Sequence, residues 1–196
     1  EIYTLSLHDA LPISYSYLPS RQANTLSDKA ALHALKYLQP EFVSYSFLDR
    51  GSDERQYCSP GIDLPVCSIM RTKYGRYPEY HTSLDDLSLV TPTGLFGGYE
   101  VLAKAIECLE MDELLSSTVL CEPQLGKRGL YPTISTKSSG SQVRDMMNYL
   151  AYCDGSSSNL EIAEKINTPL WELKETIEKL KHEGVLKTVE ATPESI

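Results

Sequence analysis

The 196-residue chain contains no Cys-x-x-Cys pair, although it has five cysteines. An odd number of cysteines without this spacing argues against a disulfide framework and a thiolate zinc knuckle. The chain also lacks the run of about 20 apolar residues that spans a bilayer. Positive charge is scarce, and the formal net charge of -9 would repel nucleic acid and anionic membranes. We therefore expect a soluble, cytoplasmic protein that binds neither nucleic acid nor membrane.

The chain is long enough for one medium domain and one small domain. Its patterns divide it into an N-terminal segment at 1–13, an α/β part at 14–115, a turn-rich linker at 116–139 and a helical part at 140–196. Residues 1–13 back-translate without a gap into a common sequencing-library adapter. We therefore expect this segment to be an artefact outside the fold, and the protein's own beginning to be missing.

The α/β part starts with the local order helix, strand, loop and strand. Thr25 and Asp28 have the spacing of a capping pair, for a helix that ends near Leu38. Alternating residues at 42–47 predict one strand. An apolar run at 64–70 predicts a second strand that is buried on both faces, as in a parallel or mixed sheet.

A long helix is predicted after Thr91, because Pro92 suits the first position of a helix. Apolar residues then recur at alternating spacings of four and three, which gives the helix an apolar stripe. The stripe consists of Leu95, Tyr99, Leu102, Ile106 and Leu109. We expect this stripe to lie along the sheet.

The helical part has three apolar patterns followed by an alternating segment at 185–189. Ser158 and Glu161 have capping-box spacing at the second helix. This order predicts a winged helix-turn-helix. Residues 138–196 carry six Lys and Arg against ten Asp and Glu. We therefore expect this domain to make protein contacts, either within the chain or between copies of it, rather than to bind DNA.

His81 is the centre of a dense polar motif at 77–86. Asp85 follows four residues later, so one helical turn could set its carboxylate beside the imidazole. Neutral imidazole is a preferred zinc ligand, and a neighbouring carboxylate commonly orients it. Helix capping by Thr82, Ser83 and Asp85 is an equally good interpretation. A lone histidine with an acid nearby is also common by chance.

Asp53 and Glu54 form a second acidic motif. They follow Gly51 and Ser52, shortly after the strand predicted at 42–47. An open sheet places its ligand crevice at such strand ends, so these acids are candidates for the site. The alternative is that one of them is a surface acid.

Two motifs carry a resemblance to a known family. They are Gly-Ser-Asp-Glu-Arg-Gln-Tyr-Cys-Ser-Pro-Gly at 51–61 and Glu-Tyr-His-Thr-Ser-Leu-Asp-Asp at 79–86. From about Tyr15 onward, the chain resembles the C-terminal part of aminopeptidase-like proteins that often accompany polysaccharide-biosynthesis genes, which are relatives of the co-catalytic zinc aminopeptidases. The resemblance implies a zinc-exopeptidase-like α/β sandwich, with a mixed sheet and flanking helices, followed by a small winged helix-turn-helix domain.

The resemblance also implies roles for particular residues. His81 falls on the last zinc ligand of the family. Asp53 falls in or beside the active site, and we assign it a catalytic role together with Asp85. Glu54 departs from the histidine that many aminopeptidases have at this place. In the intact protein the resemblance implies two zinc ions, whose bound hydroxide attacks a small peptide or amide substrate while a glutamate acts as base.

The remaining ligands and the glutamate base would precede Tyr15 in such a protein. We therefore expect the present chain to be inactive by itself. The alternative is a zinc-free, peptidase-derived scaffold joined to a winged-helix interaction module. The presence or absence of the upstream ligand set would separate the two hypotheses.

Overall fold

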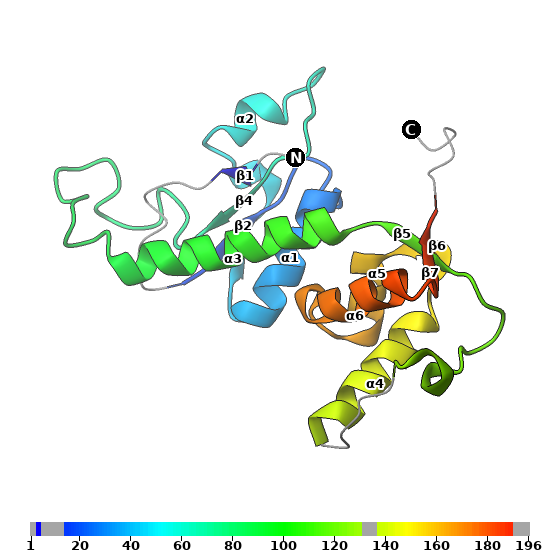
Figure 1. The fold of residues 1–196 in the computed structure, drawn as a ribbon. Helices are drawn as coiled ribbons and strands as arrows, with labels where there is room; N and C mark the ends of the chain where they lie inside the picture. Colours follow the sequence, from blue (N-terminus) through cyan, green and yellow to red (C-terminus); the bar gives the residue numbers. More distant parts are fainter. Residues whose placement is uncertain (1–2, 5–13, 131–136, 190–196) are drawn as a thin grey trace. The chain divides into compact units, whose positions relative to one another are not determined.

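The computed structural model describes residues 3–4, 14–130 and 137–189 (Figure 1). The chain divides into two compact units, Glu1–Leu109 and Glu110–Ile196. The second unit begins before the linker expected at 116–139, because strand β5 (Leu114–Ser117) pairs with strands of that unit. Of the helices in the described parts of the chain, none has the length and apolar character that a bilayer crossing requires.

The first unit is built on a mixed four-stranded sheet with the order β1-β4-β2-β3. Its strands are β1 (Tyr3–Thr4), β2 (Ser16–Leu18), β3 (Val43–Ser44) and β4 (Cys67–Met70). Strand β4 is parallel to β1 and antiparallel to β2, which is parallel to β3. All residues of β2 and β4 are buried, as predicted for the apolar run that contains β4. The mixed α/β class is therefore confirmed.

Strand β1 is the part of residues 1–13 that the structure describes. Tyr3 and Thr4 pair in parallel with Cys67 and Ser68 at the edge of the sheet. The sequence predicts that the whole segment lies outside the fold, whereas these two described residues form part of the sheet. An open sheet edge presents unpaired backbone groups that accept almost any extended chain, so this pairing needs no particular side chain.

Helix α1 (Leu26–Leu38) begins and ends as the sequence predicts. Thr25 and Asp28 form the expected capping box. The buried Asp28 carboxylate also accepts hydrogen bonds from the Tyr17 hydroxyl at 2.7 Å and the Ser20 amide at 2.8 Å. Burial alone would raise the pKa of Asp28, but hydrogen bonds from the Ser20 hydroxyl and amide, from Thr25 and from Tyr17 outweigh it, and the pKa is lowered. The charged group thereby ties the helix start to strand β2.

The strand predicted at 42–47 is shorter in the structure. It is the two-residue edge strand β3, in which Val43 is 43% exposed. A 3-10 helix, η2 (Phe47–Asp49), follows directly. Its capping box joins Ser46 and Asp49, and these local polar bonds compete with continuation of the strand.

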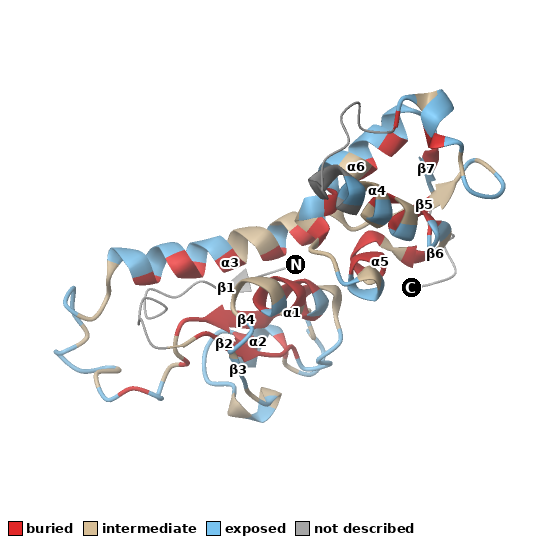
Figure 2. Cartoon of the chain, turned by 90° about the horizontal axis from the view of Figure 1, so that it is seen from below, coloured by how far each residue is buried: buried red, intermediate tan, exposed pale blue. Residues whose placement is uncertain are grey.

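Helix α3 (Pro92–Met111) begins where predicted but buries a different face (Figure 2). Its buried residues are mostly small: Gly94, Gly97, Gly98, Val101, Ala105 and Cys108. The expected stripe is more open, with Tyr99 61% exposed and Ile106 40% exposed, so that prediction is wrong. The small residues bring the helix close to its neighbours, since a Cβ on Gly97 would meet the Tyr15 hydroxyl and the Arg71 guanidinium.

The second unit contains the three-stranded sheet β6-β5-β7 and three main helices. Its elements are β5, η3 (Leu125–Arg128), α4 (Lys137–Leu150), β6 (Asp154–Ser158), α5 (Asn159–Ile166), α6 (Leu170–His182) and β7 (Leu186–Thr188). Both strand pairs are antiparallel. Strands β5 and β6 were not predicted, because β6 reads Asp-Gly-Ser-Ser-Ser and has no apolar alternation.

The three helices form the predicted winged helix-turn-helix. Ser158 and Glu161 make the expected capping box at the start of α5. Asn167 then adopts the left-handed conformation, with φ of 53°, and allows the short turn into α6. Residues on all three helices and on β5 and β7 are buried together as the core of the unit: Leu115, Met146, Tyr149, Leu160, Ile162, Leu170, Leu173, Ile177, Leu180 and Leu186.

The close approach of α3 gives a test of stability. Gly97→Ala should lower the free energy of unfolding by about 1–3 kcal/mol, because the added methyl group would overlap two buried side chains. Gly140→Ala in α4 is the matched control, since nothing lies within 4 Å of a Cβ there, and it should stabilise the protein by about 0.5–1 kcal/mol. Urea unfolding of both variants measures the difference. Equal effects would contradict the close packing of α3.

Candidate active site

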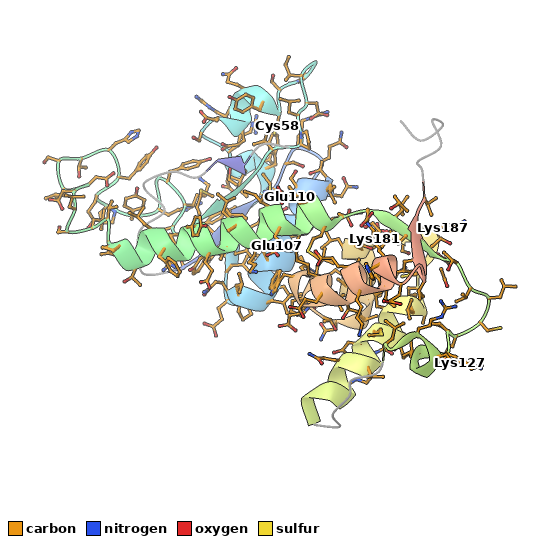
Figure 3. All side chains as sticks on the ribbon, viewed as in Figure 1. Cys58, Glu107, Glu110, Lys127, Lys181 and Lys187 are labelled. Atoms are coloured by element: carbon orange, nitrogen blue, oxygen red, sulfur yellow. The ribbon has the colours of Figure 1, made fainter. Side chains whose placement is uncertain are left out.

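The two polar motifs lie on loops of the first unit that follow sheet strands (Figure 1). The first loop leads from η2 into the short helix α2 (Glu54–Tyr57). The second loop leads from β4 to α3 and contains turns and bends. The buried thiol of Cys58, labelled beside α2 in Figure 3, lies 3.4 Å from the carbonyl oxygen of Leu64 and 3.3 Å from that of Val66. These contacts fix the end of α2 to the segment that enters β4.

His81 is exposed and has a left-handed backbone, with φ of 59°. Its imidazole stacks on the ring of Tyr80, with 3.9 Å between ring centroids and 18° between planes. The next residue closes a turn, because the Thr82 amide donates to the Glu79 carbonyl at 3.0 Å. The imidazole is thus held against a flat surface while it remains accessible to a ligand.

Asp85 does not lie one helical turn after His81, because residues 72–90 form turns and bends rather than a helix. The left-handed conformation of His81 is incompatible with a continuing right-handed helix. The Asp85 amide donates to the Thr82 carbonyl at 3.2 Å, and the Thr82 hydroxyl donates to the Glu79 carbonyl at 2.7 Å. Thr82 therefore stabilises a turn instead of capping a helix, and the role of Asp85 stays a prediction.

Asp53 is exposed at the start of α2. Its carbonyl accepts from the amides of Gln56 and Tyr57 at 2.9 and 3.1 Å, while its carboxylate makes no capping bond. The interpretation of one motif acid as a surface acid thus fits the position of Asp53. The exposed carboxylate remains available to other groups.

Glu54, in contrast, is fully buried. Its Oε1 atom accepts from the Gly51 amide at 2.8 Å, from the Ser52 amide at 3.1 Å and from the Tyr74 hydroxyl. Burial alone would raise the pKa of Glu54, but the Tyr74 hydroxyl and the two amides outweigh it, and the pKa is lowered. The carboxylate is therefore ionised at neutral pH. Its Oε2 atom has no hydrogen-bond partner among the described residues.

Tyr74 joins the two loops. Tyr74 lies on the second loop, and its hydroxyl donates to Glu54, which belongs to the first loop. Its ring lies so close to Gly51 that a Cβ at position 51 would be 2.7 Å from a ring carbon. The Lys73 ammonium lies 3.8 Å from the centroid of the same ring. Burial and hydrogen bonding to Glu54 raise the pKa of Tyr74, so this hydroxyl stays protonated and donates.

Aromatic contacts continue from Tyr74 to His81. The rings of Tyr74 and Tyr80 are 6.3 Å apart, and Tyr77 meets Tyr80 edge-on at 5.6 Å. Tyr80 then stacks on His81. The sequence-based interpretation missed Glu54 and Tyr74 as organising residues. Glu54 offered one signal, because an acid three residues after Gly51 can accept from its amide, but nothing in the sequence pointed to Tyr74.

The described residues do not by themselves fit a zinc centre. No three His, Cys, Asp or Glu side chains among residues 3–4, 14–130 and 137–189 are grouped so that they could hold a metal ion. A hydrolytic zinc site needs about three protein ligands and an open position. His81, Asp53 and Asp85 are therefore not brought together as a complete ligand set.

The mixed sheet with its flanking helices and the C-terminal unit define an α/β peptidase-like fold followed by a winged helix-turn-helix. Residues 9–112 match the family model described as domain of unknown function DUF4910, and the chain belongs to that family. Residues 112–188 match a model described as winged helix-turn-helix. The match at 9–112 includes both polar motifs.

Two similar proteins come from Clostridium acetobutylicum. One is a candidate polysaccharide biosynthesis protein with an aminopeptidase-like domain, 37% identical over 164 residues, which are 83% of this chain and 38% of that protein. The other is the crystal structure of a candidate peptidase, with 31% identity and a TM-score of 0.81, covering 92% of this chain and 40% of that chain. The resemblance to aminopeptidase-like proteins is thereby confirmed, and this chain spans less than half the length of either relative.

The ionised Glu54 predicts a pH-dependent stability. Glu54→Gln should lower the free energy of unfolding at pH 7 by about 1–3 kcal/mol, because the donors lose a charged acceptor. The folded pKa lies below the ordinary value of 4.5, so this stabilisation is present above about pH 4.5 and is lost as the pH falls through the folded pKa. Denaturant unfolding between pH 3 and 7 should show the two proteins converging at low pH.

The matched control for this experiment is Glu100→Gln, which changes an exposed acid on α3. It should alter stability by less than about 0.5 kcal/mol at any pH in the range. A constant difference between wild type and Glu54→Gln over the whole range would show that the charge of Glu54 does not stabilise the loops.

Proposed function

We propose that this chain is part of an aminopeptidase-like hydrolase that cleaves a peptide or amide bond with metal-activated water, and that His81 supplies one zinc ligand. The observation that carries the proposal is the exposed imidazole of His81, stacked on Tyr80 in a chain that shares 31% identity and its fold with a candidate peptidase. A bound zinc ion would lower the pKa of its water and polarise the substrate carbonyl. The substrate class is a small peptide or amide.

The other ligands of this site, for two zinc ions in all, are proposed to come from the region of the longer relatives that the chain does not span. The described residues offer no ligand set of their own. The present chain should therefore bind zinc weakly and catalyse no hydrolysis. Asp53 and Asp85 are proposed to act beside the metal, Asp53 toward the substrate and Asp85 as a carboxylate that orients the imidazole.

The C-terminal unit is proposed to make protein contacts, including contacts between copies of the chain. Its lysines lie on several elements, and Figure 3 labels Lys127 in the η3 turn, Lys181 on α6 and Lys187 on β7. Lys181 is already paired, with its ammonium 2.7 Å from the Glu113 carboxylate. Residues 138–196 carry more Asp and Glu than Lys and Arg, and a net negative charge offers phosphate little attraction.

The role of His81 can be tested in the full-length protein. His81→Ala should lower the bound zinc and abolish peptidase or amidase activity while the fold is retained, because His81 is exposed and its loss leaves no cavity. Asp85→Asn should have the same effect more mildly. Metal analysis of the purified proteins is the measurement.

His182→Ala is the matched control, because His182 is an exposed histidine at the end of α6. It should leave both zinc content and activity unchanged. Equal zinc in wild type and His81→Ala would contradict the ligand assignment. Zinc in neither protein would favour a metal-free scaffold.

The winged helix-turn-helix gives a separate test. Duplex DNA titrated into the 196-residue chain at 50 mM salt should produce no micromolar binding, because the chain carries a net charge of -9. Fluorescence anisotropy of a labelled duplex measures this. Salt-sensitive micromolar binding that disappears when Lys174 and Lys179 of α6 are replaced by Glu would overturn the expectation.

A further inference from the structure

The segment that carries His81 has little regular backbone structure to hold it. Its backbone–backbone hydrogen bonds are local, such as Arg76 N–H to Lys73 O at 3.1 Å and Tyr80 N–H to Tyr77 O at 3.4 Å. Such bonds shape single turns, but they do not fix a loop against the rest of a domain. Side-chain contacts must therefore set the position of this segment.

Glu54 and Tyr74 provide such a contact at the beginning of the segment. The Tyr74 hydroxyl donates to the buried carboxylate of Glu54, and the same oxygen accepts the amides of Gly51 and Ser52. One charged oxygen thus gathers three donors from two loops. Hydrogen bonds to an ionised acceptor are stronger than neutral ones, so this junction restrains the Tyr74 ring more firmly than a neutral pair would.

We propose that Glu54 is a positioning residue that fixes the orientation of the His81 imidazole through Tyr74 and Tyr80. The rings of Tyr74 and Tyr80 are 6.3 Å apart, and Tyr80 stacks on His81 at 3.9 Å. Glu54 is 0% exposed, so it does not contact solvent, and its influence on His81 would pass through these rings. The value of this positioning for catalysis rests on the proposed role of His81 as a ligand.

The same junction also restrains the loop of Asp53. Gly51 and Ser52 precede Asp53 in the chain, and Glu54 follows it. The Glu54 carboxylate accepts hydrogen bonds from the amides of Gly51 and Ser52, so it holds the backbone before Asp53. The two loops that bear the candidate site residues therefore share one anchor. A glutamine at position 54 keeps the shape of the side chain but loses the charge, and this makes Glu54→Gln a selective probe.

The orientation of His81 can be read from its ring resonances in proton–carbon NMR spectra of this 196-residue chain. The stacked Tyr80 ring displaces the His81 signals upfield, and His81→Ala identifies them among the four histidines. Glu54→Gln and Tyr74→Phe should each move these signals toward the values of an unstacked histidine. The spectra are recorded well below the melting temperature, so loss of stability alone does not move them.

Tyr99→Phe and Glu100→Gln are the matched controls, because both residues are exposed on α3. Neither control should move the His81 signals. Unchanged His81 signals in a folded Tyr74→Phe or Glu54→Gln variant would overturn the proposal, as would equal shifts in the controls. Tyr74→Phe removes a single oxygen atom, and its spectrum decides the matter when Glu54→Gln fails to fold by circular dichroism.

This experiment contains no metal and is independent of the proposed activity. If His81→Ala leaves the zinc content of the full-length protein unchanged, the ligand assignment fails, while the NMR result for Glu54 stands. If Glu54→Gln and Tyr74→Phe leave the His81 signals unchanged while His81→Ala loses zinc, positioning by Glu54 is contradicted and the ligand assignment stands.

Discussion

The buried carboxylate of Glu54 is the constraint on which the arrangement of the two polar loops depends. An ionised group without solvent contact is stable only when donors compensate for its lost hydration. Here Gly51, Ser52 and Tyr74 supply those donors. The requirement explains why glycine occupies position 51, since a side chain there would displace the Tyr74 ring.

Close packing of small residues is the second constraint on the first unit. Helix α3 places Gly97 against the side chains of Tyr15 and Arg71. Large apolar side chains of the same helix, such as Tyr99, are more exposed to solvent. The helix thus carries two apolar faces with the same period. The face with the smaller residues packs within this unit because it permits the shorter distance, and dispersion contacts increase as that distance falls.

The candidate site was only partly predictable. The sequence motifs located both loops, and the structure places His81 accessibly on one and Asp53 on the other. It overturned the helical turn between His81 and Asp85, because the left-handed backbone of His81 breaks that geometry. The resemblance marks Glu54 only as a departure from the family's pattern, whereas the structure shows that Glu54 accepts a hydrogen bond from Tyr74, which lies 20 residues away in the sequence.

The sequence by itself determined the elements whose signals are local. The sequence predicted the capping boxes of α1 and α5, the buried strand β4 and the order of the helices in the C-terminal unit. Each of these signals lies in residues that are close together in the sequence. Tertiary structure alone decided which face of α3 is buried and that Glu54 joins two loops. These outcomes depend on the distance to side chains far along the chain, and a periodic pattern contains no information about that distance.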